Sequence, residues 1–254
     1  MAKNNEKVKS FFKYTWTLVK TGIPSAFMYF CASMVLMMIC MKGEAITWDS
    51  KKLTWSAVMA LAAGAYNALI MWANGGSHYE MLVSGNIKRT AADTYGNAYK
   101  MSSHQIAKEY RDWKGFVIGA IIGALTFVAG IIFTINQDKI DGGLNGGALG
   151  VTVVILLFLC GWALLPFYCY NAHQITMAKE LGTVAVTASY AWACLFALIP
   201  VLVSGGFYIW GAYARRNKAV REQMLADRAA QAEAQREKKI NYGGLPGTKP
   251  KKRK

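Results

Sequence analysis

Five long segments of this chain contain no Asp, Glu, Lys or Arg, and this pattern constrains the fold more than any other feature. A helix needs about 20 apolar residues to cross the roughly 30 Å of hydrocarbon in a bilayer. Inside lipid the backbone must satisfy its own hydrogen bonds, so five such segments predict an all-α, polytopic helical membrane bundle. The predicted membrane-embedded segments are residues 22–41, 53–73, 115–135, 149–170 and 187–213.

These segments divide the chain into three parts. Residues 1–21 form a basic N-terminal arm, whose apolar residues recur at helical spacing between lysines, as in a helix that lies in the headgroup plane. Residues 22–213 form the transmembrane domain, with one sizeable internal loop at 74–114. Residues 214–254 form a basic tail. Its composition favours a helix up to about residue 239 and disorder after Ile240.

The formal net charge of +15 lies entirely outside the apolar segments. The basic arms are therefore expected to bind anionic lipid headgroups, and no specific nucleic acid. Lys and Arg that flank membrane segments favour the cytoplasm, and the arm, the loop 74–114 and the tail are all rich in them. The sequence thus predicts a multi-pass protein of the inner or plasma membrane with a cytoplasmic tail.

The same charges conflict with five complete crossings, because an odd number places the arm and the tail on opposite sides. The last apolar run offers a resolution, since Pro200 and the pair Gly205-Gly206 interrupt it. A proline removes a helical hydrogen bond, and paired glycines loosen a turn. We expect either a re-entrant hairpin at this point, which leaves four crossings, or a single crossing kinked at Pro200.

Small residues spaced by four predict close contacts between helices. In the third segment Gly115, Gly119 and Gly123 share one face, which lets a neighbouring backbone approach closely. In the second segment the corresponding stripe is Ala60, Gly64 and Ala68. Packing within the chain and assembly through these faces both stay open, so other membrane proteins or a second copy are the expected partners.

Polar exceptions within or beside the apolar segments include Tyr66 and Asn67 in the second segment, and Tyr168, Tyr170 and Asn171 at the end of the fourth. An unpaired amide in hydrocarbon is costly, so Asn67 must find a partner. It is expected to join two helices or, alternatively, to line a polar path.

The loop 74–114 is the predicted docking element, because loops of this length usually carry function. It opens with Asn74-Gly75-Gly76, a predicted helix stop. Nearer its end, apolar residues at helical spacing predict an amphipathic helix over 103–114. The residues expected to take part in docking are His78, Tyr79, Glu80, His104, Tyr110 and Trp113.

The chain offers few groups for chemistry. Its apolar segments hold no charged residue or histidine, which counts against a proton-coupled carrier or pump. A phosphate-binding Gly-rich loop with Lys, an HExxH motif and a GxSxG motif are all missing from the sequence. The three histidines form no tight pair, so no metal, cofactor or catalytic residue is expected.

The leading hypothesis is a non-catalytic integral membrane subunit of a larger assembly for transport or secretion. One alternative is a passive channel or facilitator for a small solute, with its route past Asn67 and the break at 200–206. The other is a membrane-embedded enzyme that acts on lipid through His78, Glu80 or His104.

Overall fold

The computed structural model describes residues 2–40, 50–83, 110–142 and 147–242. Every regular element in these ranges is a helix, which confirms the all-α prediction. Five stretches are long and apolar enough to cross a membrane, as expected of a multi-pass membrane protein. They are α1 (Ala2–Cys40), α2 (Ser50–Val83), α4 (Lys114–Ile135), α6 (Ala148–Leu181), and the short α7 (Ala191–Phe196) together with α8 (Leu198–Tyr242); the short α5 (Gln137–Asp141) follows α4.

The chain divides into two units between Ala212 and Tyr213. The first unit is the helical bundle, in which α1 packs against α2, α4 and α6, and α4 packs against α7. Its core is apolar, with Leu36, Phe133 and Leu164 fully buried. The second unit contains the C-terminal part of α8, whose side chains from residue 220 to 236 are all exposed.

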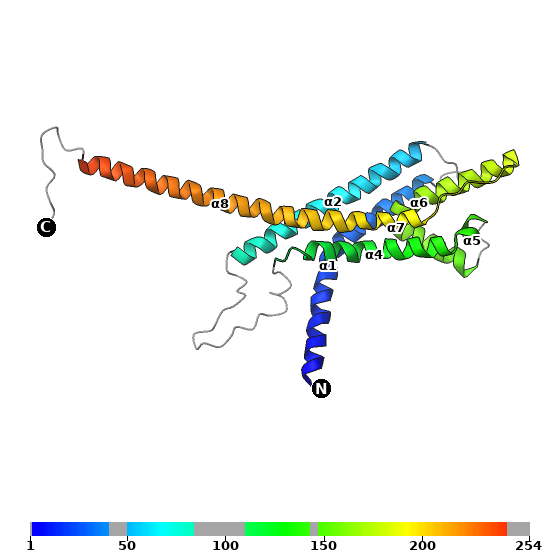
Figure 1. Cartoon of the computed structure of the whole chain (residues 1–254), viewed down its shortest axis with the longest axis horizontal. Coiled ribbons are helices and arrows are strands. Elements are labelled where there is room, and N and C mark those ends of the chain that lie inside the picture. Colours follow the sequence, from blue (N-terminus) through cyan, green and yellow to red (C-terminus); the bar gives the residue numbers. More distant parts are fainter. Residues whose placement is uncertain (1, 41–49, 84–109, 143–146, 243–254) are drawn as a thin grey trace. The chain divides into compact units, whose positions relative to one another are not determined.

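The basic arm belongs to α1, because this helix runs without a break from Ala2 to Cys40. Pro24 lies inside it, and Figure 1 shows that the darker N-terminal part of α1 runs in a different direction from the lighter part. A proline inside a helix is a common cause of such a bend. The orientation of the arm in a headgroup plane stays a prediction.

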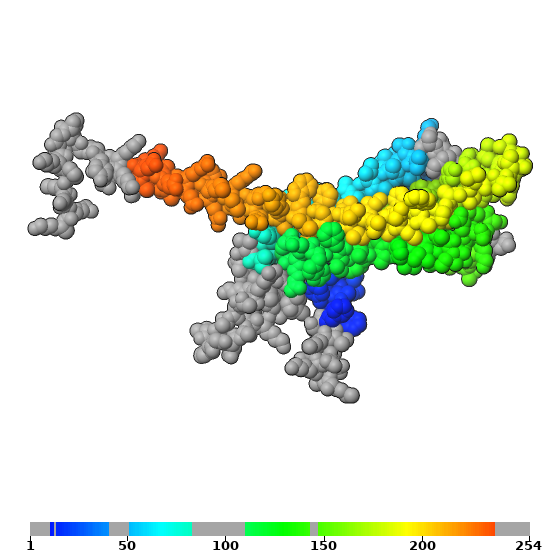
Figure 2. Space-filling model, viewed as in Figure 1, coloured from blue at the N-terminus to red at the C-terminus, as the bar shows by residue number. Residues whose placement is uncertain are grey.

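Helix α4 lies in backbone contact with α7 and α8, and Figure 2 shows the green and yellow helices side by side. A Cβ atom on Gly119 would meet the Pro200 carbonyl oxygen at 2.5 Å, and one on Gly115 would meet the Tyr208 Cβ at 2.6 Å. Gly123 faces the Ala197 backbone in the same way. The glycine face of α4 is thus occupied by helices of the same chain.

The predicted helix stop at residues 74–76 is wrong, because α2 continues through them to Val83. The backbone of Tyr208 in α8 lies directly against Gly75, where any Cβ would collide with it. Gly211 of α8 likewise lies against the backbone of Trp72. These glycines therefore permit close contact of α2 with α8, and this contact outweighs their low helix propensity.

The re-entrant hairpin predicted at 200–206 is also wrong, because α8 runs through Pro200, Gly205 and Gly206 as one helix. The interruption lies at Ala197, between α7 and α8. A proline ring clashes with the carbonyl four residues earlier, here that of Phe196, which accounts for the break one turn before Pro200. Pro200 itself sits in the first turn of α8, where its missing N–H is tolerated.

Helix α6 reverses its direction at Cys160, whose backbone angles of φ −124° and ψ 17° are not helical. A straight helix would place Ala148 about 34 Å from Asn171. However, Asn171 donates to Asp141, and the seven residues from Asp141 to Ala148 can span about 25 Å at most. The two arms of α6, residues 148–159 and 161–181, therefore both extend from Cys160 toward the α5 end of the bundle (Figure 1).

Ser33 of α1 satisfies the backbone at this bend. Its Oγ accepts the N–H of Trp162 at 3.0 Å and donates to the Tyr29 carbonyl at 2.9 Å, with the Leu159 carbonyl 3.4 Å away. Ser33 and Cys160 are both buried. Irregular backbone at membrane depth is tolerated where protein covers it, and Ser33 meets that requirement here.

Because α6 reverses its direction, the N-terminal part of α1 and the part of α8 around Tyr208 lie at the same end of the bundle. Tyr14 of α1 contacts Trp113 just before α4, and Tyr208 of α8 contacts His78 near the end of α2. Because α6 returns to the end from which it starts, α1, α2, α4 and α7–α8 are the elements that run the full length of the bundle. Within the residues that the structure describes, four elements thus run along the bundle, and α6 folds back on itself at Cys160.

Candidate functional site

The end of the bundle where α2 ends and α4 begins holds a cluster of aromatic residues, here called the aromatic end cluster. His78 Nδ1 lies 2.8 Å from the Tyr208 hydroxyl. The ring of Tyr110 stacks on that of Tyr208, with centroids 5.4 Å apart and planes within 8°. Tyr79 meets Tyr110 edge-on at 5.9 Å. Three of the predicted docking residues, His78, Tyr79 and Tyr110, thus come together around Tyr208.

Helix α1 joins the same cluster through Tyr14. Its ring lies 6.3 Å from that of Trp113, and the ammonium nitrogen of Lys114 lies 5.7 Å from its centroid. Lys114 is fully buried, whereas Trp113 is 43% exposed. A desolvated cation over an aromatic face is stabilised by about 2 kcal/mol. The cluster therefore fastens α1, α2, α4 and α8 to one another at this end.

The segment before α4 differs from the predicted amphipathic helix over 103–114. Residues 110–113 are not helical, and α4 begins at Lys114, whose N–H bonds to the Arg111 carbonyl at 3.0 Å. Because the backbone of residues 110–113 is not helical, the Tyr110 ring can stack on Tyr208 of α8. Residues 103–109, including His104, lie outside the described residues.

Tyr110 has an electrostatic environment that favours its neutral form. Burial raises the pKa of its phenol above the usual value of 10, and the neighbouring Asp112 raises that pKa further by hydrogen bonding and by its negative charge. The phenol therefore stays protonated at neutral pH. As a neutral group it can stack on Tyr208 without desolvating a charge.

The remaining predicted residues lie elsewhere. Glu80 is exposed near the end of α2, and Tyr66 is 36% exposed on that helix. Asn67 is fully buried and exchanges two hydrogen bonds with Ser204 of α8, at 2.9 and 3.2 Å. Asn67 therefore joins α2 to α8. The small residues predicted to share one face of α2 differ in their surroundings. Ala68 is buried and Ala60 is half-buried, whereas a Cβ on Gly64 would meet no atom within 4 Å.

Asn171 organises the opposite end of the bundle. Its amide exchanges hydrogen bonds with the Ala188 backbone, at 2.7 Å from the Ala188 N–H and 3.0 Å to the Ala188 carbonyl. It also donates to Asp141 of α5 at 3.4 Å, and the Tyr190 hydroxyl donates to the same carboxylate at 3.1 Å. Sequence reasoning missed Asp141, Tyr190 and Ser33. Their roles depend on the return of α6, which no local pattern reports.

The charges of the chain are distributed unequally among its segments. The arm 1–21, the connection 74–114 and the tail 213–254 hold 24 of the 29 Lys and Arg residues and nine of the 14 Asp and Glu residues. The segments 41–52, 136–148 and 172–190 hold five basic and five acidic residues. The entire net charge of +15 therefore belongs to the arm, the connection 74–114 and the tail.

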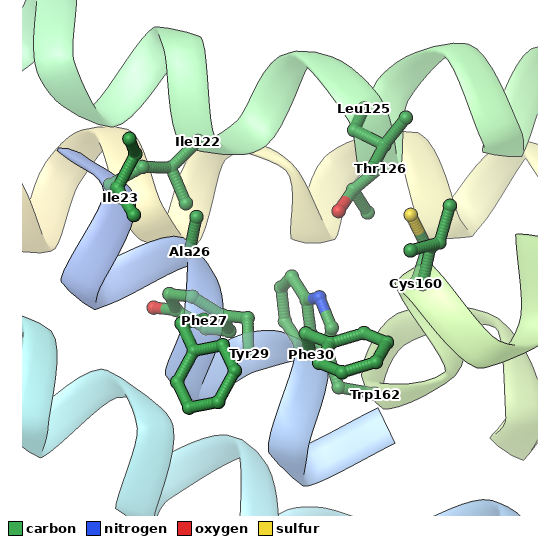
Figure 3. Close-up of a pocket in the computed structure, with 11 residues that line it drawn as sticks. Ile23, Ala26, Phe27, Tyr29, Phe30, Ile122, Leu125, Thr126, Cys160 and Trp162 are labelled. Atoms are coloured by element: carbon green, nitrogen blue, oxygen red, sulfur yellow. The ribbon is translucent and has the colours of Figure 1, made fainter. Parts of the chain in front are cut away.

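A cavity of about 310 Å³ lies beside the bend of α6 (Figure 3). Ile23 and Ala26 of α1, Leu125 and Thr126 of α4, and Cys160 of α6 surround it. Its lining is mostly apolar. Within the part of the chain that the structure describes, no group of three His, Cys, Asp or Glu side chains is placed to hold a metal ion.

Comparison of the chain with known protein families, with curated proteins and with solved structures found no match.

Proposed function

We propose that this chain is a non-catalytic membrane subunit that holds a protein partner at its basic end, within an assembly for transport or secretion. The observation that supports this proposal best is the C-terminal part of α8. All of its side chains from residue 220 to 236 are exposed, although Val220 and Met224 are apolar and share one helical face. Helices in proteins gain most of their stability from packing of an apolar face, so a partner on this face would stabilise the tail.

The electrostatics of the same end support a cytoplasmic partner. Residues 213–254 hold 13 basic and four acidic residues. An excess of Lys and Arg beside membrane segments favours the cytoplasmic side, and the arm and the connection 74–114 have such an excess as well. We therefore propose that the tail, the arm and the aromatic end cluster all face the cytoplasm.

The two alternative functions receive less support from the packing. The route expected for a facilitator runs past Asn67, Pro200 and Gly205, which are buried in the contacts of α8 with α2 and α4. The lipid enzyme would use His78, Glu80 or His104. His78 Nδ1 lies 2.8 Å from the Tyr208 hydroxyl, Glu80 is exposed, and His104 lies outside the described residues.

Affinity purification of the full chain in mild detergent tests the proposal, with mass spectrometry of the proteins that accompany it. The informative variant is Met224→Glu, which places a charge on the apolar face of the tail. The matched control is Ala229→Glu, since nine residues from Val220 correspond to about 180° around a helix. We expect at least a tenfold loss of the partner with Met224→Glu and full retention with Ala229→Glu.

Two outcomes would count against this function. One is purification of the chain without any stoichiometric protein partner. The other is solute flux into liposomes that contain only this chain, which would favour the facilitator.

A further inference from the structure

Two cysteines from different helices meet where α1 ends, and they are here called the cysteine pair. Cys40 is the last residue of α1, and Cys169 lies in the second arm of α6. Both side chains are buried, with exposed fractions of 3% and 2%. Both are free thiols, and they lie within hydrogen-bonding reach of each other. A single S–S bond between them would connect α1 to α6.

The register of the two helices explains why these cysteines meet. Ser33 of α1 accepts the Trp162 N–H at the α6 bend, and a Cβ on Gly161 would lie 3.4 Å from the Ser33 Cβ. From this contact both helices run toward the α5 end of the bundle. Cys40 follows Ser33 by seven residues, and Cys169 follows Trp162 by seven residues. Seven residues are two helical turns to within about 20°, so the faces that meet at the bend meet again at the cysteine pair.

The close approach of the two backbones suits a disulfide. The Cβ atoms of a disulfide lie about 3.5–4.5 Å apart, which requires neighbouring backbones. The backbones of α1 and α6 are that close at Ser33 and Gly161. Between this point and the cysteine pair the helices stay packed, since Leu36 and Leu165 are both buried. The S–S bond can therefore form without refolding either helix.

Lys52 of α2 gives the cysteine pair an electropositive setting. Its ammonium nitrogen donates to the Cys40 carbonyl at 3.4 Å, and its charge acts on both sulfur atoms. A cation beside a cysteine favours the thiolate, which is the nucleophilic form. Lys52 is half-buried and Cys40 ends its helix, so the pair lies at the edge of the core.

The burial of the two sulfur atoms restricts the oxidants that can reach them. Thiol–disulfide exchange requires an attacking thiolate to reach a sulfur of the partner disulfide. At 3% and 2% exposure, neither cysteine offers room for a protein or a tripeptide disulfide. Hydrogen peroxide is little larger than water and needs no such room. A small peroxide is therefore the class of oxidant that fits this site.

We propose that hydrogen peroxide converts Cys40 and Cys169 into an intramolecular disulfide that fixes the end of α1 to the second arm of α6. The Cys40 thiolate attacks one peroxide oxygen, the O–O bond breaks, and the hydroxide that leaves takes up the thiol proton as water. The Cys169 thiol then attacks the sulfenic sulfur of Cys40, and the hydroxyl group leaves with the Cys169 proton as a second water. The two sulfur atoms lose two electrons in total, and the peroxide gains them. This reaction does not depend on the proposed protein partner or on the side of the membrane.

Peptide mapping of the full chain tests this proposal. The chain is purified in detergent with a reductant, freed of the reductant and treated with hydrogen peroxide. Remaining thiols are blocked with N-ethylmaleimide, and the chain is digested without reduction for mass spectrometry. Cys40→Ser removes one member of the pair. Cys31→Ser is the matched control, because it makes the same chemical change on the same helix at a half-buried cysteine.

We expect the wild type and Cys31→Ser to lose two hydrogen atoms and to give a peptide in which Cys40 is linked to Cys169. Dithiothreitol should restore both thiols, and the oxidised wild type should need more sodium dodecyl sulfate to unfold than the reduced chain. Cys40→Ser should give at least tenfold less intramolecular disulfide. Recovery of Cys40 and Cys169 in the wild type as unlinked thiols or sulfinic acids would overturn the proposal. Equal linkage of either one to Cys31, Cys160 or Cys194 would overturn it as well.

Discussion

The contact of α4 with α8 makes a sharp prediction for the substitution Gly119→Ala. The added Cβ would lie 2.5 Å from the Pro200 carbonyl oxygen and 2.6 Å from the Val201 Cα, both of which are backbone atoms. Ordinary van der Waals contact begins at 3.4 Å, so α8 must move by about 0.9 Å. A radial gap of 0.5–1 Å forfeits about a quarter to a half of the dispersion energy of the atoms concerned.

The expected cost follows from two opposing terms. Overpacking of a well-packed interface costs about 1–3 kcal/mol. Alanine in a helix interior gains about 1 kcal/mol over glycine, which partly offsets this cost. Gly64→Ala in α2 is the matched control, because its Cβ meets no atom within 4 Å and the propensity gain is the same. Gly119→Ala should therefore be about 1–3 kcal/mol less stable than Gly64→Ala.

Equilibrium unfolding in detergent micelles, titrated with sodium dodecyl sulfate and followed by circular dichroism, measures this difference. If Gly119→Ala proved as stable as Gly64→Ala, the backbone contact of α4 with α8 would be refuted. The larger change Gly119→Ile should prevent folding of the bundle, since a branched side chain cannot be accommodated by so small a shift.

Three further predictions concern buried polar groups and use the same unfolding assay. Ser33→Ala leaves the Trp162 N–H at the α6 bend without its acceptor and should cost about 1–3 kcal/mol; no loss would exclude a role for Ser33 at the bend. Ser204→Ala should lower the free energy of unfolding. The double variant Ser204→Ala/Asn67→Leu should lose less free energy than the sum of the two single variants, because the two side chains bond to each other. Strictly additive losses would argue against this pair. The pKa of Tyr110 is higher in the folded chain than in the unfolded chain, so its neutral phenol stabilises the fold fully below about pH 10, and this stabilisation is lost as pH rises through the folded pKa. The free energy of unfolding should therefore fall less between about pH 9 and 11 in Tyr110→Phe than in the wild type. Equal losses in the two proteins would contradict this.

The helices themselves could be predicted from the sequence, because apolar length is a property of each segment alone. Each predicted segment lies almost entirely within helices of the structure, although most of these helices extend beyond it. The local rules for helix breaks were less reliable. Gly75 and Gly76 continue α2 because the α8 backbone fills the space that a side chain would need.

The sequence predicts a hairpin in the last apolar run, whereas the structure has the reversal of the chain in α6. The last apolar run contains Pro200 and a glycine pair, but α6 contains Gly161 and Pro166, which are an equivalent signal. The sequence cannot distinguish the two, because the decisive group is Ser33 on another helix. The aromatic end cluster was predicted in part, since His78, Tyr79 and Tyr110 were named, whereas Tyr208 and Tyr14 join it only through tertiary packing.

The return of α6 offers a resolution of the conflict between five apolar segments and the basic charge at both chain ends. We propose that the chain crosses the membrane four times, which would place the arm and the tail on one side, the side that the preference for cytoplasmic Lys and Arg favours.

Labelling with a membrane-impermeant maleimide in sealed vesicles tests this topology most directly. Single cysteines are introduced as Lys139→Cys, Val184→Cys and Asn217→Cys, all at exposed positions, and the unsubstituted chain gives the background from its five buried or half-buried cysteines. The re-entrant α6 predicts that positions 139 and 184 react from the same side and position 217 from the other. Reaction of 139 and 217 from one side and 184 from the other would establish five crossings and contradict the account.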